Sequence, residues 1–190
     1  MIVLPAVPFG VNTGQLDIPL TINMNPSTQA IVLADIASSL SAQGIHKLVI
    51  INGHGGNDFR QMIRELQPRV DVFISTINWW SCLDSSAYFD EPGDHAGELE
   101  TSVMMAIAPH GMRPVSEAGA GKARKFRIAG LREGWAWAPR KWTEVTDDTG
   151  VGNPAKATRE KGEKFLDAVT ERIAGYLVEL AAADRANLYE

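Results

Sequence analysis

Two segments of the chain place a histidine among residues that could bind a ligand or transfer a proton. The first is a glycine-rich turn that directly follows an apolar run, Asn52-Gly53-His54-Gly55-Gly56-Asn57. In open parallel sheets, ligands bind at the carboxyl ends of the strands, and glycines there let a ligand approach the backbone closely. His54 could therefore point into a crevice. Equally, the turn could cradle a phosphate, or its histidine could cap a helix. It has neither a Walker A nor a Gly-x-Gly-x-x-Gly pattern.

The second segment combines a histidine with three acids, in the run Asp94-His95-Ala96-Gly97-Glu98-Leu99-Glu100-Thr101-Ser102. His95 and Glu98 are three residues apart, so on a helix they would share a face. Histidine and carboxylate together are ligands for zinc, manganese or iron. Acids in a first helical turn also favour the helix dipole. The dipole would explain Glu98 and Glu100 without any function, but it does not explain the histidine beside them.

Other residue types give weaker signals. Five tryptophans could line a pocket or an interface, although aromatic residues are commoner in a core; they are Trp79, Trp80, Trp135, Trp137 and Trp142. Cys82 is the single cysteine, which excludes an intramolecular disulfide and suits a reducing compartment. It has no basic neighbour in sequence that would activate it as a nucleophile.

Alternating strand and helix patterns would position both histidine segments. The order predicted is a strand at 2–4, a loop at 5–24, a helix from Pro26 to Gly44, a strand at 47–51, a helix from 59 to 66, a strand at 70–77, a helix at 97–108, an irregular stretch at 110–152 and a long C-terminal helix after Asn153-Pro154. Strands that alternate with helices imply right-handed crossovers and a parallel sheet. We therefore predict an α/β fold, with a mainly parallel sheet between two helical layers.

Composition limits the class of protein. A length of 190 residues favours a single domain, residues 1–190. Hydrophobic residues make up 45% and charged residues 22%, which excludes disorder, collagen and coiled coil as descriptions of the whole chain. A net charge of −5 gives no general case for nucleic-acid binding, apart from one short basic run at 122–127. No apolar run approaches the ~20 residues of a membrane span, and no signal-peptide pattern occurs at the N-terminus. We expect a cytoplasmic protein without membrane or nucleic-acid partners.

The two histidine motifs together resemble the creatininase (creatinine amidohydrolase) family. The similarity covers nearly the whole chain, including residues 4–10, 48–57, 95–102, 149–154 and 160–162. The resemblance implies a metal-dependent hydrolase with a parallel sheet between helices and a one- or two-metal centre. It also implies a homo-oligomer, usually a hexamer, that acts on a small-molecule substrate.

Residue roles follow from the same resemblance. His54 matches a metal ligand, and His95 matches the histidine proposed to pass a proton to the leaving group. Creatininase has a glutamate where this chain has Gly56, so we infer that Glu98 replaces it as a ligand, with Glu100 less favoured. The expected cofactor is a divalent metal, zinc or else manganese or iron, whose bound hydroxide attacks a carbonyl carbon. Candidate substrate-binding residues are Gly55, Gly56, Asn57, Trp80 and Asp94.

One departure from the family matters. Family members open with a strand and a Glu-x-His-Gly-x-His-Leu-Pro segment that supplies metal ligands, whereas this sequence begins at Met1-Ile2-Val3. We expect a truncated chain that lacks the first strand and helix, that is poorly soluble and inactive alone, and that binds metal weakly. His54 and Glu98 should still converge on one crevice. The alternatives are hydrolysis of a cyclic ketone such as an inosose, or a non-catalytic assembly subunit.

Overall fold

The computed structural model describes residues 1–190 and divides the chain into two compact units. One unit comprises Met1–Trp79 together with Gly175–Glu190, and the other comprises Trp80–Ala174. The single domain expected from the length stays a prediction. None of the helices is both long enough and apolar enough to cross a membrane.

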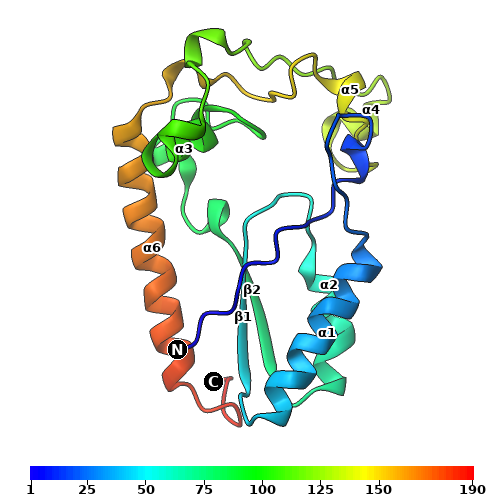
Figure 1. Cartoon of the computed structure of the whole chain (residues 1–190), viewed down its shortest axis with the longest axis vertical. Coiled ribbons are helices and arrows are strands. Elements are labelled where there is room, and N and C mark those ends of the chain that lie inside the picture. The colour runs from blue at the N-terminus through cyan, green and yellow to red at the C-terminus, as the bar shows by residue number, and fades with distance from the viewer. The chain divides into compact units, whose positions relative to one another are not determined.

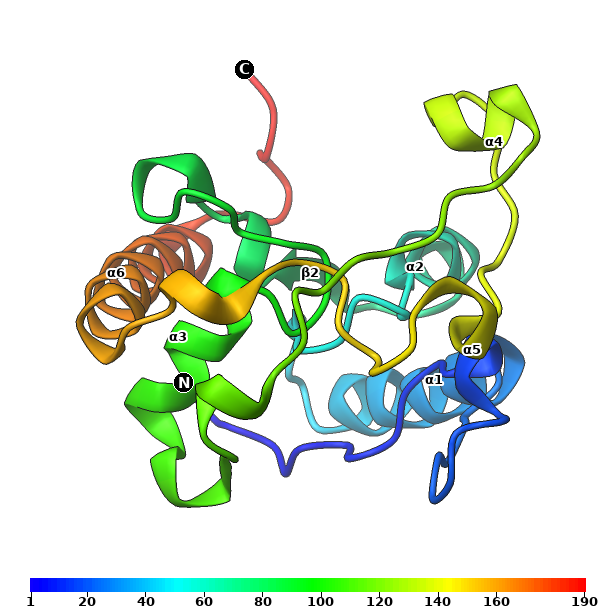
Figure 2. The ribbon, with the colours of Figure 1, turned by 90° about the horizontal axis from the view of Figure 1, so that it is seen from above.

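The first unit is built on a two-stranded parallel sheet. Strand β1, Lys47–Asn52, pairs with β2, Phe73–Asn78, in the register Lys47↔Phe73 to Asn52↔Asn78. Helices α1, Pro26–Ala42, and α2, Phe59–Leu66, lie beside this sheet (Figures 1 and 2). Their apolar faces and the strands share one core cluster, made of Leu33, Ala37, Met62, Leu66, Val72 and Ile74. The parallel strands and crossover helix predicted from the apolar runs are confirmed.

Local sequence signals account for the ends of these helices. Pro26 occupies the first turn of α1, where its missing N–H costs nothing. Gly44 takes a φ of +73° just after the helix ends, a conformation that glycine adopts without strain. The Asp58 side chain caps α2 by accepting a hydrogen bond from the Arg60 backbone N–H at 3.1 Å.

The strand predicted at 2–4 is wrong. Residues 1–9 have no regular secondary structure, and the first backbone pairing is an isolated parallel bridge, Gly10↔Asn23. Met1, Ile2 and Val3 are exposed. Apolar, β-branched residues form a strand only where a neighbouring strand takes up their backbone hydrogen bonds. The described register pairs β1 and β2 with each other and not with this segment.

The second unit is mostly helical and irregular. It contains α3, Glu98–Ile107, the short helices α4, Ala129–Glu133, and α5, Trp142–Val145, and the first part of α6, Arg159–Ala182. Its buried core includes Phe89, Leu99, Val103, Trp142, Phe165 and Val169. Single 3-10 turns complete the two units, at Thr13–Gln15, Gln67–Arg69, Trp79–Ser81, Ser85–Ala87, Pro109–Gly111, Val115–Glu117 and Pro154–Lys156.

Helices α3 and α6 approach each other closely at Gly162. A Cβ atom built on Gly162 would lie 2.0 Å from the backbone oxygen of Ser102, which cannot move aside as a flexible side chain would. Gly175 lies in the same helix, but a Cβ there would meet nothing within 4 Å. The two glycines therefore predict opposite effects of the same substitution.

Gly162→Ala should lower the free energy of unfolding by about 1–3 kcal/mol, the usual cost of overpacking. Gly175→Ala should raise it by about 0.5–1 kcal/mol, because alanine is the better helix former. Urea unfolding of the two variants and the parent protein measures both values. If Gly162→Ala were stabilising, the close approach of α6 to α3 would be contradicted.

Candidate active site

The His54 turn connects the carboxyl end of β1 to the start of α2, as the sequence predicts. The His54 backbone N–H donates to Asn52 Oδ1 at 3.1 Å. On the ring, His54 Nε2 lies 3.0 Å from the backbone carbonyl oxygen of Val11. A carbonyl oxygen can only accept, so Nε2 carries the proton in this contact. In a neutral ring, Nδ1 then keeps its lone pair and can bind a cation.

A chain of side-chain amides surrounds this turn. Asn57 Oδ1 accepts from the Val11 backbone N–H at 3.0 Å and from Gln29 Nε2 at 3.1 Å. Asn57 Nδ2 donates to Asn52 Oδ1 at 3.0 Å, and Asn52 Nδ2 donates to Asn78 Oδ1 at 2.9 Å. Asn52 and Gln29 are buried. The Asn57 side-chain oxygen therefore accepts two hydrogen bonds from within the protein. These bonds indicate a structural role for Asn57, which differs from its predicted role in substrate binding.

Sequence reasoning assigned no role to the side chains of Gln29, Asn52 and Asn78 or to the Val11 backbone. One signal was available, because both apolar strands end in asparagine. In a parallel pair with Asn52 opposite Asn78, the two amides meet at the same sheet edge. The other two residues are distant in sequence from the turn, and no local pattern indicates them.

His95 lies outside helix α3 and is held through its backbone. Its N–H donates to the Val151 oxygen at 3.0 Å, and the Val151 N–H donates to the His95 oxygen at 2.8 Å. The ring Nδ1 lies 3.9 Å from Glu100 Oε2, and the two side chains are 39% and 46% exposed. The ring also meets Trp142 edge to face, with centroids 5.3 Å apart. His95 is therefore both accessible and next to a carboxylate.

Asp94 forms an ion pair with Arg140. The Arg140 guanidinium carbon in turn lies 4.5 Å from the centre of the Trp142 ring. Asp94 is thus engaged on the protein side, and its predicted part in substrate binding stays a prediction. Trp80 is half-buried in the 3-10 turn that follows β2.

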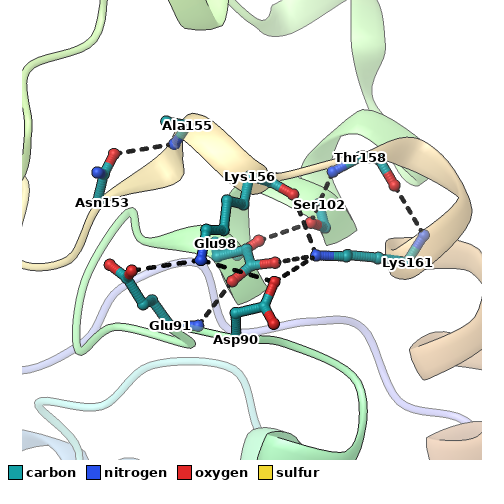
Figure 3. Close-up of polar contacts among 9 residues, drawn as sticks. All are labelled: Asp90, Glu91, Glu98, Ser102, Asn153, Ala155, Lys156, Thr158 and Lys161. Carbon is teal, nitrogen blue, oxygen red and sulfur yellow. Dashed lines mark hydrogen bonds and ion pairs between the residues drawn. The ribbon is translucent and has the colours of Figure 1, made fainter.

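Glu98, the predicted metal ligand, is completely buried, and Figure 3 shows its polar contacts. Its Oε2 accepts from the Glu91 backbone N–H at 2.8 Å, and its Oε1 pairs with Lys161 Nζ. The hydrogen bond with Glu98 raises the pKa of the Lys161 ammonium, an effect that desolvation opposes and Asp90 reinforces. The carboxylate is therefore neutralised by a cation of the same unit.

The surroundings of Glu98 count against its predicted role. A metal would have to displace Lys161, because both carboxylate oxygens already have partners. The argument that His95 and Glu98 share a helix face also fails, since α3 begins at Glu98 with Gly97 as its N-cap. The Glu100 carboxylate is more exposed and lies beside His95, and its Oε2 accepts from the Ala96 backbone N–H at 2.6 Å. Glu98 as a ligand, with Glu100 as the less favoured candidate, stays a prediction.

The described residues contain no group of three or more His, Cys, Asp or Glu side chains arranged to hold a metal ion. His54 belongs to the first unit, whereas Glu98 belongs to the second. Their expected convergence on one crevice stays a prediction.

The model of the family described as creatinine amidohydrolase matches residues 1–177. The chain belongs to the creatininase family. A crystal structure from Bacteroides fragilis, named as a candidate creatinine amidohydrolase, is 46% identical with a TM-score of 0.90, and the match covers 98% of this chain and 74% of that one. A creatininase structure at 21% identity and a TM-score of 0.76 covers 95% of this chain and 75% of that one, and it shows the shared fold. The family and the α/β fold class predicted from the sequence are confirmed.

Curated relatives of this creatininase-family chain are more distant. The mycofactocin precursor peptide peptidases of two Mycobacterium tuberculosis strains are 26% identical over 173 residues, 88% of this chain. The chain spans about 61% of their length. These relatives bear on substrate class, which is treated below.

The buried pair predicts unequal effects of two lysine substitutions. Lys161→Met leaves the buried Glu98 carboxylate without a cation and should lower the urea midpoint strongly. Lys156→Met removes only exposed contacts with Asp90 and Glu91, at 3.9 and 3.6 Å, and should change it little. The raised pKa keeps Lys161 charged at neutral pH, and its contribution is lost only as pH rises through the folded-state pKa. The difference between the variants should therefore persist over roughly pH 6–9.

The double variant Glu98→Gln/Lys161→Met provides the control for charge. It removes both partners of the pair, so it should recover part of the stability that Lys161→Met loses. Equal midpoints for Lys161→Met and Lys156→Met would contradict a structural role of Glu98.

Proposed function

We propose that the protein is a divalent-metal-dependent hydrolase that acts on a carbonyl carbon of a small amide. The observation that carries this proposal is the state of the His54 ring. Histidines that ligate metals usually donate their other ring N–H to a backbone carbonyl or a carboxylate. The Nε2–H of His54 is directed at the Val11 carbonyl oxygen, which leaves Nδ1 as the ligating atom. The first unit therefore offers one metal ligand, the Nδ1 atom of His54.

Structures of similar proteins support zinc and manganese as the candidate metals. Solved creatininase structures with TM-scores of 0.68 and 0.66 include a zinc–zinc form and a manganese form. A divalent metal polarises a carbonyl group and lowers the pKa of bound water. In the second unit, Glu100 is our preferred ligand candidate, because its carboxylate is part-exposed and Glu98 is committed to Lys161.

His95 is proposed to act as the general acid that protonates the leaving group. When protonated, its ring pairs with Glu100, which lies 3.9 Å from Nδ1. The edge-to-face contact with Trp142 and the backbone bridge to Val151 restrict where the ring can turn. Such a ring can hold a proton and give it to a leaving nitrogen as the tetrahedral intermediate collapses.

The substrate class stays open within amides and related carbonyl compounds. Creatinine-like cyclic amides, formamides on pyrimidines, peptide precursors and cyclic ketones are the candidates. The curated relatives act, by their name, on a precursor peptide, which adds weight to peptides. A cytoplasmic homo-oligomer is part of the same proposal.

Substitution of the histidines separates metal binding from proton transfer. In the metal-loaded protein, His95→Gln should lower kcat by about 10²–10⁴-fold, the usual contribution of a general acid, with metal content unchanged. His54→Gln should lower metal content. His110→Gln, at an exposed position, is the matched control and should alter neither. Metal content is measured by mass spectrometry, and hydrolysis is measured on one compound of each candidate class.

Failure would take a recognisable form. If the metal-loaded protein hydrolysed none of these compounds, the non-catalytic assembly subunit would be the better description. If His95→Gln and His110→Gln were equally active, proton transfer by His95 would be wrong.

A further inference from the structure

We infer that Gly56 and Asn57 are positioning residues, which together hold the Val11 carbonyl against His54 and thereby set its ring tautomer. Neither residue touches the metal in this account. The use of Nδ1 as a ligand rests on the proposed function, whereas the tautomer itself does not. The inference replaces the predicted substrate-binding roles of these two residues.

Two backbone N–H donors determine how the side-chain amides in this hydrogen-bonded series are oriented. The Val11 N–H can only donate, so the Asn57 atom that faces it must be the oxygen. The His54 N–H can only donate, so the facing Asn52 atom must also be the oxygen. Asn57 must then present its nitrogen to Asn52, as the 3.0 Å contact requires. The orientation follows from donors whose identity is certain, and not from a choice between oxygen and nitrogen positions.

Val11 is consequently held from both sides of its peptide groups. Asn57 accepts its N–H at 3.0 Å, and His54 Nε2 donates to its carbonyl at 3.0 Å. Gln29, itself buried, donates to the same Asn57 oxygen and restricts its movement. Only the Nε2–H tautomer of His54 can make this contact. A loose Val11 would let the ring rotate or exchange its proton between the two nitrogens.

Gly56 provides the space in which this hydrogen bond forms. A Cβ atom on Gly56 would lie 2.1 Å from the Val11 oxygen and 2.6 Å from His54 Nε2. It would therefore clash with both the donor and the acceptor of this hydrogen bond, which would have to move apart. The φ of Gly56 is not in the left-handed region, so conformational freedom does not explain the glycine. Close approach of the ring and the Val11 carbonyl does.

Gly10 also lacks space for a side chain, because the Asn57 amide and the His54 ring lie close to its backbone. A Cβ on Gly10 would lie 2.9 Å from Asn57 Oδ1 and 3.0 Å from His54 Cδ2. The Asn57 amide and the His54 ring are thus packed against backbone that carries no side chain. Such packing restricts both groups to the positions that the hydrogen bonds require.

The test is a two-bond ¹H–¹⁵N spectrum of the metal-free protein, which separates protonated from unprotonated ring nitrogens. The chain has 4 histidines, and the His54 signals are assigned by their loss in His54→Gln. The parent protein should show a single Nε2–H tautomer with a slowly exchanging proton. Gly56→Ala, which wedges the bond apart, and Asn57→Ala, which releases Val11, should both give fast exchange and a mixture of tautomers.

Gly53→Ala is the matched control. Its Cβ would meet nothing within 4 Å, and its φ is not left-handed. It should keep the parent spectrum. Circular dichroism and urea unfolding confirm that each variant folds. Titration with Mn²⁺ or Zn²⁺ gives a second measurement, in which Gly56→Ala and Asn57→Ala should bind about 10–100-fold more weakly, the usual effect of losing an outer partner of a ligand.

The two measurements distinguish failure of the inference from failure of the proposed function. An Nδ1–H tautomer in the parent, or folded Gly56→Ala and Asn57→Ala variants with the parent spectrum, would overturn the inference. If the spectra changed as expected while the parent protein bound neither metal, the positioning of His54 would stand and the metal-dependent function would be wrong.

Discussion

The buried carboxylate of Glu98 links the main segments of the second unit. Removing the Glu98 charge from water costs several kcal/mol unless a cation and hydrogen bonds replace the lost solvation. Lys161 near the start of α6 supplies the cation, and the Glu91 backbone supplies a hydrogen bond. One buried group thereby joins three segments: the loop at 90–91, helix α3 and helix α6. The Ser102 hydroxyl adds a further link, since it donates to the backbone carbonyl oxygen of Glu98 and accepts from the Thr158 backbone N–H.

The inward direction of Glu98 decides what Glu100 can do. Residues two apart on a helix are separated by roughly 200° around its axis. With Glu98 buried, Glu100 must point to a different side, and there it lies beside His95. The rule that places residues three apart on one helix face could not apply to His95, because the helix starts after it. The sequence revealed both acids and the histidine, but the starting point of α3 determines which acid is available to a metal or a proton carrier.

The parts of the fold that the sequence predicted are those with strong local signals. Pro26 and Gly44 bound α1, and the apolar run at 47–51 predicted a strand, which the structure places at Lys47–Asn52 with Ile51 exposed. The strand expected at 2–4 failed because a strand depends on a partner that local sequence cannot supply. Helices α4 and α5 are one turn or little more, too short for a 3.6-residue period to appear. At the site, the turn position of His54 was predictable, but its hydrogen bond to Val11, 43 residues away, was not.

The two histidines are held in ways that match different tasks. A metal ligand must keep one ring nitrogen fixed and unprotonated, and the hydrogen bond from His54 Nε2 to the Val11 carbonyl oxygen meets this requirement for Nδ1. A proton carrier must instead reach its substrate and change protonation state, so its ring cannot be committed to a backbone acceptor. His95 is anchored through its main chain to Val151, which leaves the ring to a carboxylate and an aromatic edge. The proposed division of roles, with His54 as ligand and His95 as acid, rests on this difference: the ring is fixed in one histidine and the backbone in the other.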